Sequence, residues 1–225
     1  MNNLKVKAFG GTLLVLICMG ALLFIAAGTL NYWQAWVFLI MFGVAGLAIV
    51  VYFAQKDPKL LERRLSGGPT AEQRTSEKLL MSVLSLGFIA MLVLPALDHR
   101  FGWSSVPPFV SIVAYVLFAL GWVIIFFVFK ENSFTASTIQ IADDQKVVSS
   151  GPYAIVRHPM YVGSFLYILT MPIVLGSWWG LLVFLLMAPF GLQRIFDEET
   201  LLKESLPGYT EYTQKVRYRM IPRVW

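Results

Sequence analysis

The 225-residue chain has few charged side chains, one cysteine and two histidines. Only 14% of its residues are charged, against about 25% in a typical soluble domain, which argues against a soluble fold. The single cysteine, Cys18, excludes a disulfide framework and a cysteine metal cluster. The two histidines, His99 and His158, are far apart in sequence, which argues against a histidine metal site. We therefore expect no bound metal.

Apolar sequence, by contrast, is abundant, since 57% of the residues are hydrophobic. Runs of about 20 apolar residues recur, the length at which an α-helix crosses a hydrocarbon core of about 30 Å. The alternating pattern typical of membrane barrels is absent. We predict an all-α, polytopic membrane helix bundle with a cytoplasmic C-terminal helical segment. The apolar segments lie at about 8–30, 32–54, 79–97, 107–129, 159–175 and 178–193.

Basic residues are distributed unevenly among the connecting segments. If both termini are cytoplasmic, Arg100 is the only one of the 18 Lys and Arg residues on the far side, and the positive-inside rule favours that orientation. The first apolar run lacks a small-residue cleavage site, so we expect it to remain as an anchor. The net charge of +5 then reflects topology and contact with anionic membrane lipids, not nucleic-acid binding. We expect a multi-pass protein of a bacterial inner membrane whose active site faces the cytoplasm.

The last two apolar segments are short. Residues 161–196 must hold two passes, although two full spans need roughly 40 residues plus a turn. Pro189 and Gly191 are expected to interrupt the second pass. The hairpin then either thins the bilayer locally or stops partway. Because broken helices at membrane depth occur beside protein or a polar cavity, this points to a site near the cytoplasmic end of the hairpin.

The stretch GPYAIVRHPMYVG, residues 151–163, leads from a polar loop into the fifth apolar segment. Pro159 suits the first position of a helix, which places His158 near the N-cap. Free N–H groups and the positive dipole end of a helix attract anions, and Arg157 adds a guanidinium fork. Gly163 permits close approach of a ligand or a neighbouring helix. Alternatively, Arg157 and His158 only anchor the helix at the membrane interface.

The second polar region is GLQRIFDEETLLKESLPGYTEYTQKV. Glu199 falls in the middle of an apolar stripe at helical spacing, where a carboxylate needs a partner or a role. The alternative is that Glu199 pairs with Lys203 in solvent. Glu198 lies at the edge of the stripe, with Arg194 four residues earlier as a possible partner. The stripe itself consists of Leu192, Ile195, Phe196, Leu202 and Leu206.

Three further segments have weaker signals. Pro207-Gly208 ends the helix, and Tyr209 and Tyr212 begin a second short one; such tyrosines more often lie in the membrane interface than against a ligand. We expect the basic tail that follows to contact the membrane surface. In the early loop, Pro58 to Leu65 predicts a short interfacial helix that is either a solvated connector or a support for the site or a lipid headgroup.

The two polar motifs, GPYAIVRHPMYVG and DEETLLKESLPGYTEYTQKV, followed by Ile-Pro, resemble the isoprenylcysteine carboxyl methyltransferase and phospholipid methyltransferase superfamily. The resemblance begins near Asn132; earlier residues are similar only as generic membrane helices. It implies a membrane enzyme that uses S-adenosylmethionine to methylate a lipophilic or membrane-associated acceptor. It also implies that residues 1–130 form four N-terminal spans and residues 131–225 form the catalytic region.

The resemblance further implies that the cofactor lies between the last hairpin and the C-terminal segment. No G-x-G-x-x-G motif suggests a Rossmann domain instead. We expect the cofactor's carboxylate at the Arg157/His158 end and a glutamate on its ribose hydroxyls or ammonium group. The catalytic candidates are Arg157, His158 and Glu199. The cofactor-binding candidates are Tyr153, Arg157, His158, Pro159, Tyr161, Gly163, Glu198, Glu199, Tyr209 and Tyr212.

The chemistry then needs mainly alignment and partial dehydration, because the sulfonium already activates the methyl group. A carboxylate acceptor needs no base, whereas an amine or thiol needs His158 or a glutamate. Two other functions stay open. A membrane NADPH-dependent reductase of the sterol type is similar near its C-terminus, although the Gly-Pro-Tyr lead-in and the absence of a cysteine near Glu198 disfavour it. The other is a non-catalytic protein that binds lipid or a partner.

Overall fold

The computed structural model describes residues 2–72, 74–139, 141–142 and 144–225. Over these residues the chain forms eight α-helices and two short 3-10 helices, with no β-strand. The predicted all-α fold is confirmed. In chain order the elements are α1 (Asn2–Ala27), α2 (Trp33–Lys56), α3 (Pro58–Leu65), η1 (Pro69–Ala71), α4 (Thr75–Phe101), α5 (Pro108–Glu131), η2 (Gly151–Ala154), α6 (Pro159–Val174), α7 (Gly180–Ser205) and α8 (Tyr209–Lys215).

Five of the described helices, α1, α2, α4, α5 and α7, are long and apolar enough to cross a membrane. The sixth apolar helix, α6, has 16 residues. At 1.5 Å per residue it is about 24 Å long, short of a hydrocarbon core of about 30 Å. The six predicted segments are therefore all present, and the polytopic membrane bundle is confirmed. The last hairpin is short because its first helix, α6, is short.

The predicted interruption of the last segment is wrong. Helix α7 runs without a break through Pro189 and Gly191 to Ser205. Membrane helices tolerate an internal proline where neighbouring groups satisfy the freed backbone. Gly191 lets the ring of Phe165 on α6 pack on the α7 backbone, since a Cβ there would lie 2.8 Å from the ring. One rigid helix thus carries the carboxylates of the second polar motif.

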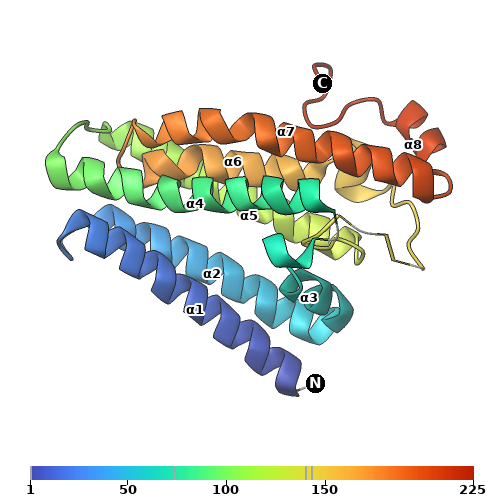
Figure 1. The fold of residues 1–225 in the computed structure, drawn as a ribbon, viewed down its shortest axis with the longest axis horizontal. Helices are drawn as coiled ribbons and strands as arrows, with labels where there is room; N and C mark the ends of the chain where they lie inside the picture. The colour runs from blue at the N-terminus through green and yellow to red at the C-terminus, as the bar shows by residue number, and fades with distance from the viewer. Residues whose placement is uncertain (1, 73, 140, 143) are drawn as a thin grey trace.

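The helices form a bundle in which the α1–α2 hairpin is inclined to the other long helices (Figure 1). Of all helix pairs, α5 and α6 pack most closely, and α4 packs against α7. All six apolar helices contribute side chains to the main core, which includes the fully buried Phe38, Met91 and Phe118. Both termini lie toward the end of the bundle that carries α3 and α8 (Figure 1).

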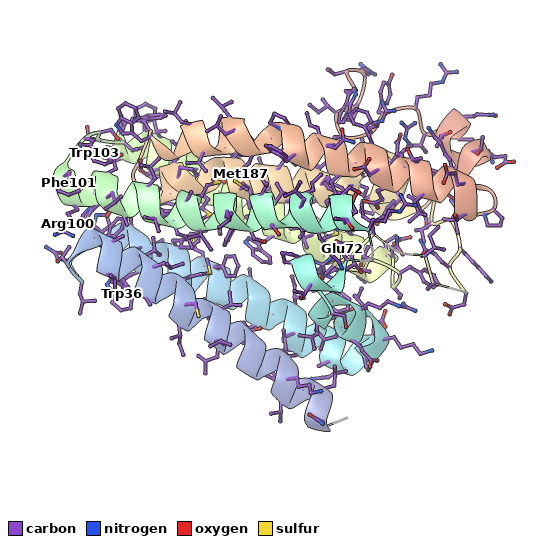
Figure 2. The ribbon with its side chains drawn as sticks, viewed as in Figure 1. Trp36, Glu72, Arg100, Phe101, Trp103 and Met187 are labelled. Atoms are coloured by element: carbon purple, nitrogen blue, oxygen red, sulfur yellow. The ribbon has the colours of Figure 1, made fainter. Side chains whose placement is uncertain are left out.

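The opposite end carries aromatic side chains and the isolated basic residue. Figure 2 shows Trp36, Phe101 and Trp103 there together with Arg100. The three aromatic side chains are largely exposed, as in the belts of Trp and Tyr at membrane–water interfaces. This end is the one at which the α1–α2 and α4–α5 connections lie (Figure 1).

A buried aspartate closes that end of the bundle. Asp98 is 1% exposed, and its Oδ1 accepts the backbone N–H of Ser104 at 2.7 Å. Its Oδ2 accepts the hydroxyls of Ser104 at 2.6 Å and Ser177 at 2.5 Å. Because a buried carboxylate must be hydrogen-bonded, these contacts fix the α4–α5 and α6–α7 connections to each other.

The close contact of α5 and α6 depends on two facing glycines. A Cβ on either Gly121 or Gly163 would lie 2.7 Å from the carbonyl oxygen of the other. Small residues let membrane helices approach at the backbone. The sequence predicted that Gly163 contacts either a ligand or a neighbouring helix, and in the structure it contacts helix α5.

We expect Gly163→Ala to destabilise the protein by about 1–3 kcal/mol, because the new methyl group would overlap backbone that cannot move aside. The measurement is the apparent melting temperature of the detergent-purified protein. Gly10→Ala on the exposed face of α1 is the control, since nothing lies within 4 Å of its Cβ position. It should leave the melting temperature unchanged or slightly raised, because alanine favours helix. Equal melting temperatures for the two variants would contradict the close contact.

Candidate functional site

A cavity of about 520 Å³ lies where α4, α6 and α7 meet α8 and the loop after α5. Its volume is in the range of roughly 300–1,000 Å³ typical of small-molecule sites. Toward α8 its wall is polar and includes Asn132, Arg157, His158 and Glu198. Along the bundle its wall is apolar and includes Leu84 and Phe88 of α4, Phe165 of α6, and Phe184 and Met187 of α7.

The first polar motif lies at the junction of this wall and the C-terminal tail. His158 is the N-cap residue of α6 and the helix begins at Pro159, as predicted. The backbone N–H of Arg157 donates to the carbonyl of Tyr218 at 2.9 Å, and that of His158 donates to Arg219 at 2.9 Å. The tail therefore runs beside the motif, so two segments far apart in sequence form one edge of the site.

The Glu199 carboxylate is the centre of a buried charge cluster. Its Oε1 accepts from Arg157 Nε at 2.7 Å and lies 3.2 Å from His158 Nε2. Its Oε2 accepts from Arg219 Nε at 3.0 Å and lies 3.8 Å from Lys203 Nζ. The contact with Lys203 that belonged to the alternative interpretation is therefore present, at the outer limit of an ion pair. The alternative of a solvent-exposed Glu199 is wrong, because the residue is 2% exposed.

This cluster changes the interpretation of two other predictions. Arg157 and His158 are both buried, so the alternative that they only anchor a helix at the membrane interface is wrong. The tail was expected to contact the membrane surface, but Arg219 turns inward to Glu199. The cause is the same in both cases, since a buried carboxylate requires opposite charges around it.

The second glutamate, Glu198, faces the cavity and has a different partner from the one predicted. The hydroxyl of Tyr161 donates to Glu198 Oε2 at 2.8 Å. Arg194 instead pairs with two carboxylates from the N-terminal half, with Nη2 at 2.7 Å from Glu72 and Nη1 at 2.8 Å from Glu77. Figure 2 shows Glu72 at the end of the bundle that carries α3. A buried arginine with two carboxylates therefore ties the early loop to α7.

Three tyrosines complete the polar wall. The Tyr153 hydroxyl accepts from Asn132 Nδ2 at 3.0 Å, and its carbonyl accepts the Tyr212 hydroxyl at 2.7 Å. The Tyr209 hydroxyl is buried and has no partner within the described residues. Burial raises the pKa of Tyr209 and Tyr153, and raises that of Tyr212 to about 12, so all three hydroxyls stay protonated at neutral pH. Tyr209 and Tyr212 are thus buried wall residues and not members of an interfacial belt.

Most of the predicted site residues line one cavity, but two do not. Gly163 packs against α5, as described above, and is not part of the cavity wall. Glu199 lies outside the wall and contacts it through Arg157 and His158. The prediction that Glu199 is a catalytic residue stays a prediction. The predicted residues that do line the cavity are Tyr153, Arg157, His158, Pro159, Tyr161, Glu198, Tyr209 and Tyr212.

Arg64 and Asn132 also line the cavity, although neither is among the cofactor-binding residues predicted from the sequence. Helix α3 has the predicted bounds, and Asp57 caps it by accepting the N–H of Leu60 at 3.1 Å. It buries Leu60 and Leu61 and directs Arg64 to the cavity wall. Of the two interpretations of this segment, support for the site fits the structure. The signal for Arg64 in the sequence is its position four residues after Leu60, on the same face of a short helix.

The fold and the cavity define a helical, multi-pass membrane protein with a polar site at one end of its bundle. Residues 109–207 match the family model described as phospholipid methyltransferase. Over 75 residues the chain is 40% identical to protein-S-isoprenylcysteine O-methyltransferase of Schizosaccharomyces pombe, and the match covers 32% of each chain. The chain thus spans about a third of the length of this relative. The resemblance to the isoprenylcysteine carboxyl methyltransferase and phospholipid methyltransferase superfamily is confirmed.

We expect Glu199→Gln to loosen the tail, because the amide leaves Arg157 and Arg219 without their buried counter-charge. Breaking a buried ion pair typically costs about 3–5 kcal/mol. The measurement is hydrogen–deuterium exchange of residues 216–219, which should become faster. Glu204→Gln, at an exposed position of the same helix, should leave that exchange unchanged. Unchanged protection in Glu199→Gln would show that the carboxylate does not hold the tail.

Proposed function

We propose that this protein is an integral membrane methyltransferase that transfers the methyl group of S-adenosylmethionine to a lipophilic acceptor. The observation that carries the proposal is the cavity itself, whose polar wall, built from the two motifs, continues into an apolar wall between α4, α6 and α7. The match to the phospholipid methyltransferase family and the named activity of the yeast relative support it.

The polar wall fits a ligand that has an amino-acid group and a ribose. Tyr209 is 4% exposed and its hydroxyl lacks a partner within the described residues, which is rare for a buried polar atom unless a ligand satisfies it. Glu198 uses Oε2 for Tyr161, and its Oε1 can accept from a ribose hydroxyl or an ammonium group. When bound, S-adenosylmethionine supplies a methyl group already activated by its sulfonium.

Arg157 retains only part of its donor capacity for a ligand. Its Nε is bonded to Glu199, and its Nη1 donates to the carbonyls of Val216 and Arg217 at 3.3 and 3.2 Å. Within the described residues Nη2 makes no hydrogen bond, so it is the atom we assign to the cofactor's carboxylate. Arg157 would then bind the carboxylate through this one nitrogen, without the two-point fork that the sequence suggested.

His158 is suited to accept a proton from an amine or thiol acceptor. Its Nε2 faces the Glu199 carboxylate, which only accepts hydrogen bonds, so we infer that Nε2 carries the proton of the neutral ring. The other ring nitrogen, Nδ1, then has a lone pair and makes no hydrogen bond within the described residues. Glu199 would fix the tautomer and orient the ring, as carboxylates do for catalytic histidines.

The apolar lining beside the polar wall fits an acceptor that arrives through the membrane. An isoprenylcysteine-type carboxylate, a lipid amine and a lipophilic thiol all remain compatible with it. Residues of α3 and α8 line the site, and these helices lie at one end of the bundle (Figure 1), where most basic residues occur. The positive-inside rule supports a cytoplasmic site and cytoplasmic termini. We propose a bacterial inner membrane as its location.

The direct test is calorimetry of the detergent-purified protein with S-adenosylmethionine, S-adenosylhomocysteine and NADPH. We expect the first two to bind and NADPH not to bind. Membranes that contain the protein, incubated with methyl-labelled S-adenosylmethionine, should yield a labelled product that extracts into organic solvent. Binding of NADPH alone would favour a reductase and refute the proposal. Binding of none of the three would favour a non-catalytic membrane protein.

We expect Tyr209→Phe to weaken S-adenosylmethionine binding by roughly three- to tenfold, about the factor of one lost neutral hydrogen bond. Its thermal stability should be unchanged or slightly higher, because the removed hydroxyl is unsatisfied without ligand. Tyr212→Phe is the matched control, since its hydroxyl bonds the Tyr153 carbonyl and its loss should lower stability instead. If Tyr209→Phe bound the cofactor like the wild type, the hydroxyl would have no role in the site.

A further inference from the structure

A second cavity of about 240 Å³ lies beside the first, among α1, α2, α3, α5 and α6. Its wall is mainly apolar and contains side chains such as Ile49, Phe53, Leu60 and Ile125. Neither Asp nor Glu is among its described lining residues. Arg64 is therefore the one charged side chain among the described residues that line this cavity.

The two cavities share one stretch of wall. Arg64, Met160, Ser164 and Tyr167 line both of them. These residues come from α3 and α6, so the partition between the cavities consists of side chains and not of a whole helix. A molecule in the second cavity can thus contact the same arginine as a molecule in the first.

Arg64 forms no ion pair within 4 Å among the described residues. Its Nη1 donates to the carbonyl of Ala136 at 2.8 Å, and its guanidinium lies 4.9 Å from the centre of the Phe129 ring. Its Nε and Nη2 make no hydrogen bond among those residues. By contrast, Arg157 and Arg194 are bonded to buried carboxylates. Burial lowers the pKa of Arg64 to about 10, so the guanidinium is still charged at pH 7.

A second unpartnered donor lies on the wall of the same cavity. The indole Nε1 of Trp122 is buried and has no hydrogen-bond partner within the described residues. Trp122 lines the second cavity and its ring stacks on Tyr167 at 5.3 Å. An indole N–H only donates. Two independent groups on this wall therefore have donors without an acceptor among the described residues: Nε and Nη2 of Arg64, and Nε1 of Trp122.

We propose that the second cavity binds an anionic amphiphile, with its carboxylate or phosphate on Arg64 and its alkyl chain against the apolar wall. The guanidinium matches both anions, and Trp122 can donate to a further oxygen of the same molecule. If the proposed methyltransferase function holds, this amphiphile is the acceptor, and Arg64 selects acceptors that carry a negative charge.

The test uses three probes of equal chain length: palmitate, hexadecyl phosphate and hexadecanol. Their binding to the full-length protein in neutral detergent is measured by native mass spectrometry. Wild type should bind both anions more tightly than the alcohol. Arg64→Gln should weaken both anions by roughly tenfold or more, the factor of one charged hydrogen bond, and leave the alcohol unchanged. Arg64→Lys should retain part of the selectivity, and Trp122→Phe should weaken the anions by roughly two- to tenfold.

Arg63→Gln is the matched control. Arg63 also bonds one loop carbonyl, that of Ser133 at 2.7 Å, and also lies over one ring, that of Phe134 at 5.1 Å, but it lines neither cavity. It should bind all three probes like the wild type, and both glutamine variants should melt at similar temperatures. Equal losses in Arg63→Gln and Arg64→Gln, or wild-type binding that does not distinguish palmitate from hexadecanol, would overturn the proposal.

Cofactor binding separates this proposal from the proposed function. Because Arg64 lines both cavities, Arg64→Gln should lose more affinity for the anionic probes than for S-adenosylmethionine. If it lost cofactor affinity instead and kept its amphiphile affinity, Arg64 would belong to the cofactor site and the amphiphile site would be refuted. If wild type bound the anionic probes selectively but no S-adenosylmethionine, the amphiphile site would stand and the methyltransferase function would fall.

Discussion

The site depends on one buried negative charge, that of Glu199. A carboxylate at 2% exposure is tolerated only when hydrogen bonds and opposite charges replace its water. Glu199 obtains these from Arg157 and His158, at the start of α6, and from Arg219 in the tail. Satisfying one carboxylate therefore brings three distant parts of the chain together. Arg157 and His158, which bind Glu199, also line the cavity and form part of its polar wall.

A second buried ion cluster does the same for the N-terminal half. Arg194 on α7 bonds Glu72 and Glu77, and Glu72 Oε2 also accepts the backbone N–H of Ile139. These bonds hold helix α7 to two loops beside the cavity, the early loop before α4 and the loop after α5. Residues that resemble the superfamily only as generic membrane helices thus supply part of the wall, including Arg64 and Phe88. The division into spans at 1–130 and a catalytic region at 131–225 stays a prediction about function, because the cavity wall draws on both parts.

The sequence predicted those features that depend on neighbouring residues in the chain. Apolar runs gave the spans, Pro159 gave the start of α6, and the stripe around Glu199 marked a carboxylate in need of partners. The partners themselves are 42 residues away for Arg157 and 122 for the Arg194–Glu72 pair, and no local pattern specifies such pairings. The interruption predicted at Pro189 is wrong for a related reason, since α7 packs against α4 and α6 along its length and such tertiary contacts can override a local helix-breaking signal.

The two cavities differ in whether their buried arginines are paired with carboxylates. Around the polar wall the buried arginines are neutralised by glutamates of the chain, so a ligand there must present donors and acceptors to groups that are already oriented. On the wall of the second cavity, Arg64 and Trp122 present donors only. A zwitterionic cofactor and an anionic amphiphile are complementary to these two environments respectively. Under the proposed function, each substrate would therefore recognise its own cavity by charge, and the two would meet across side chains of α3 and α6.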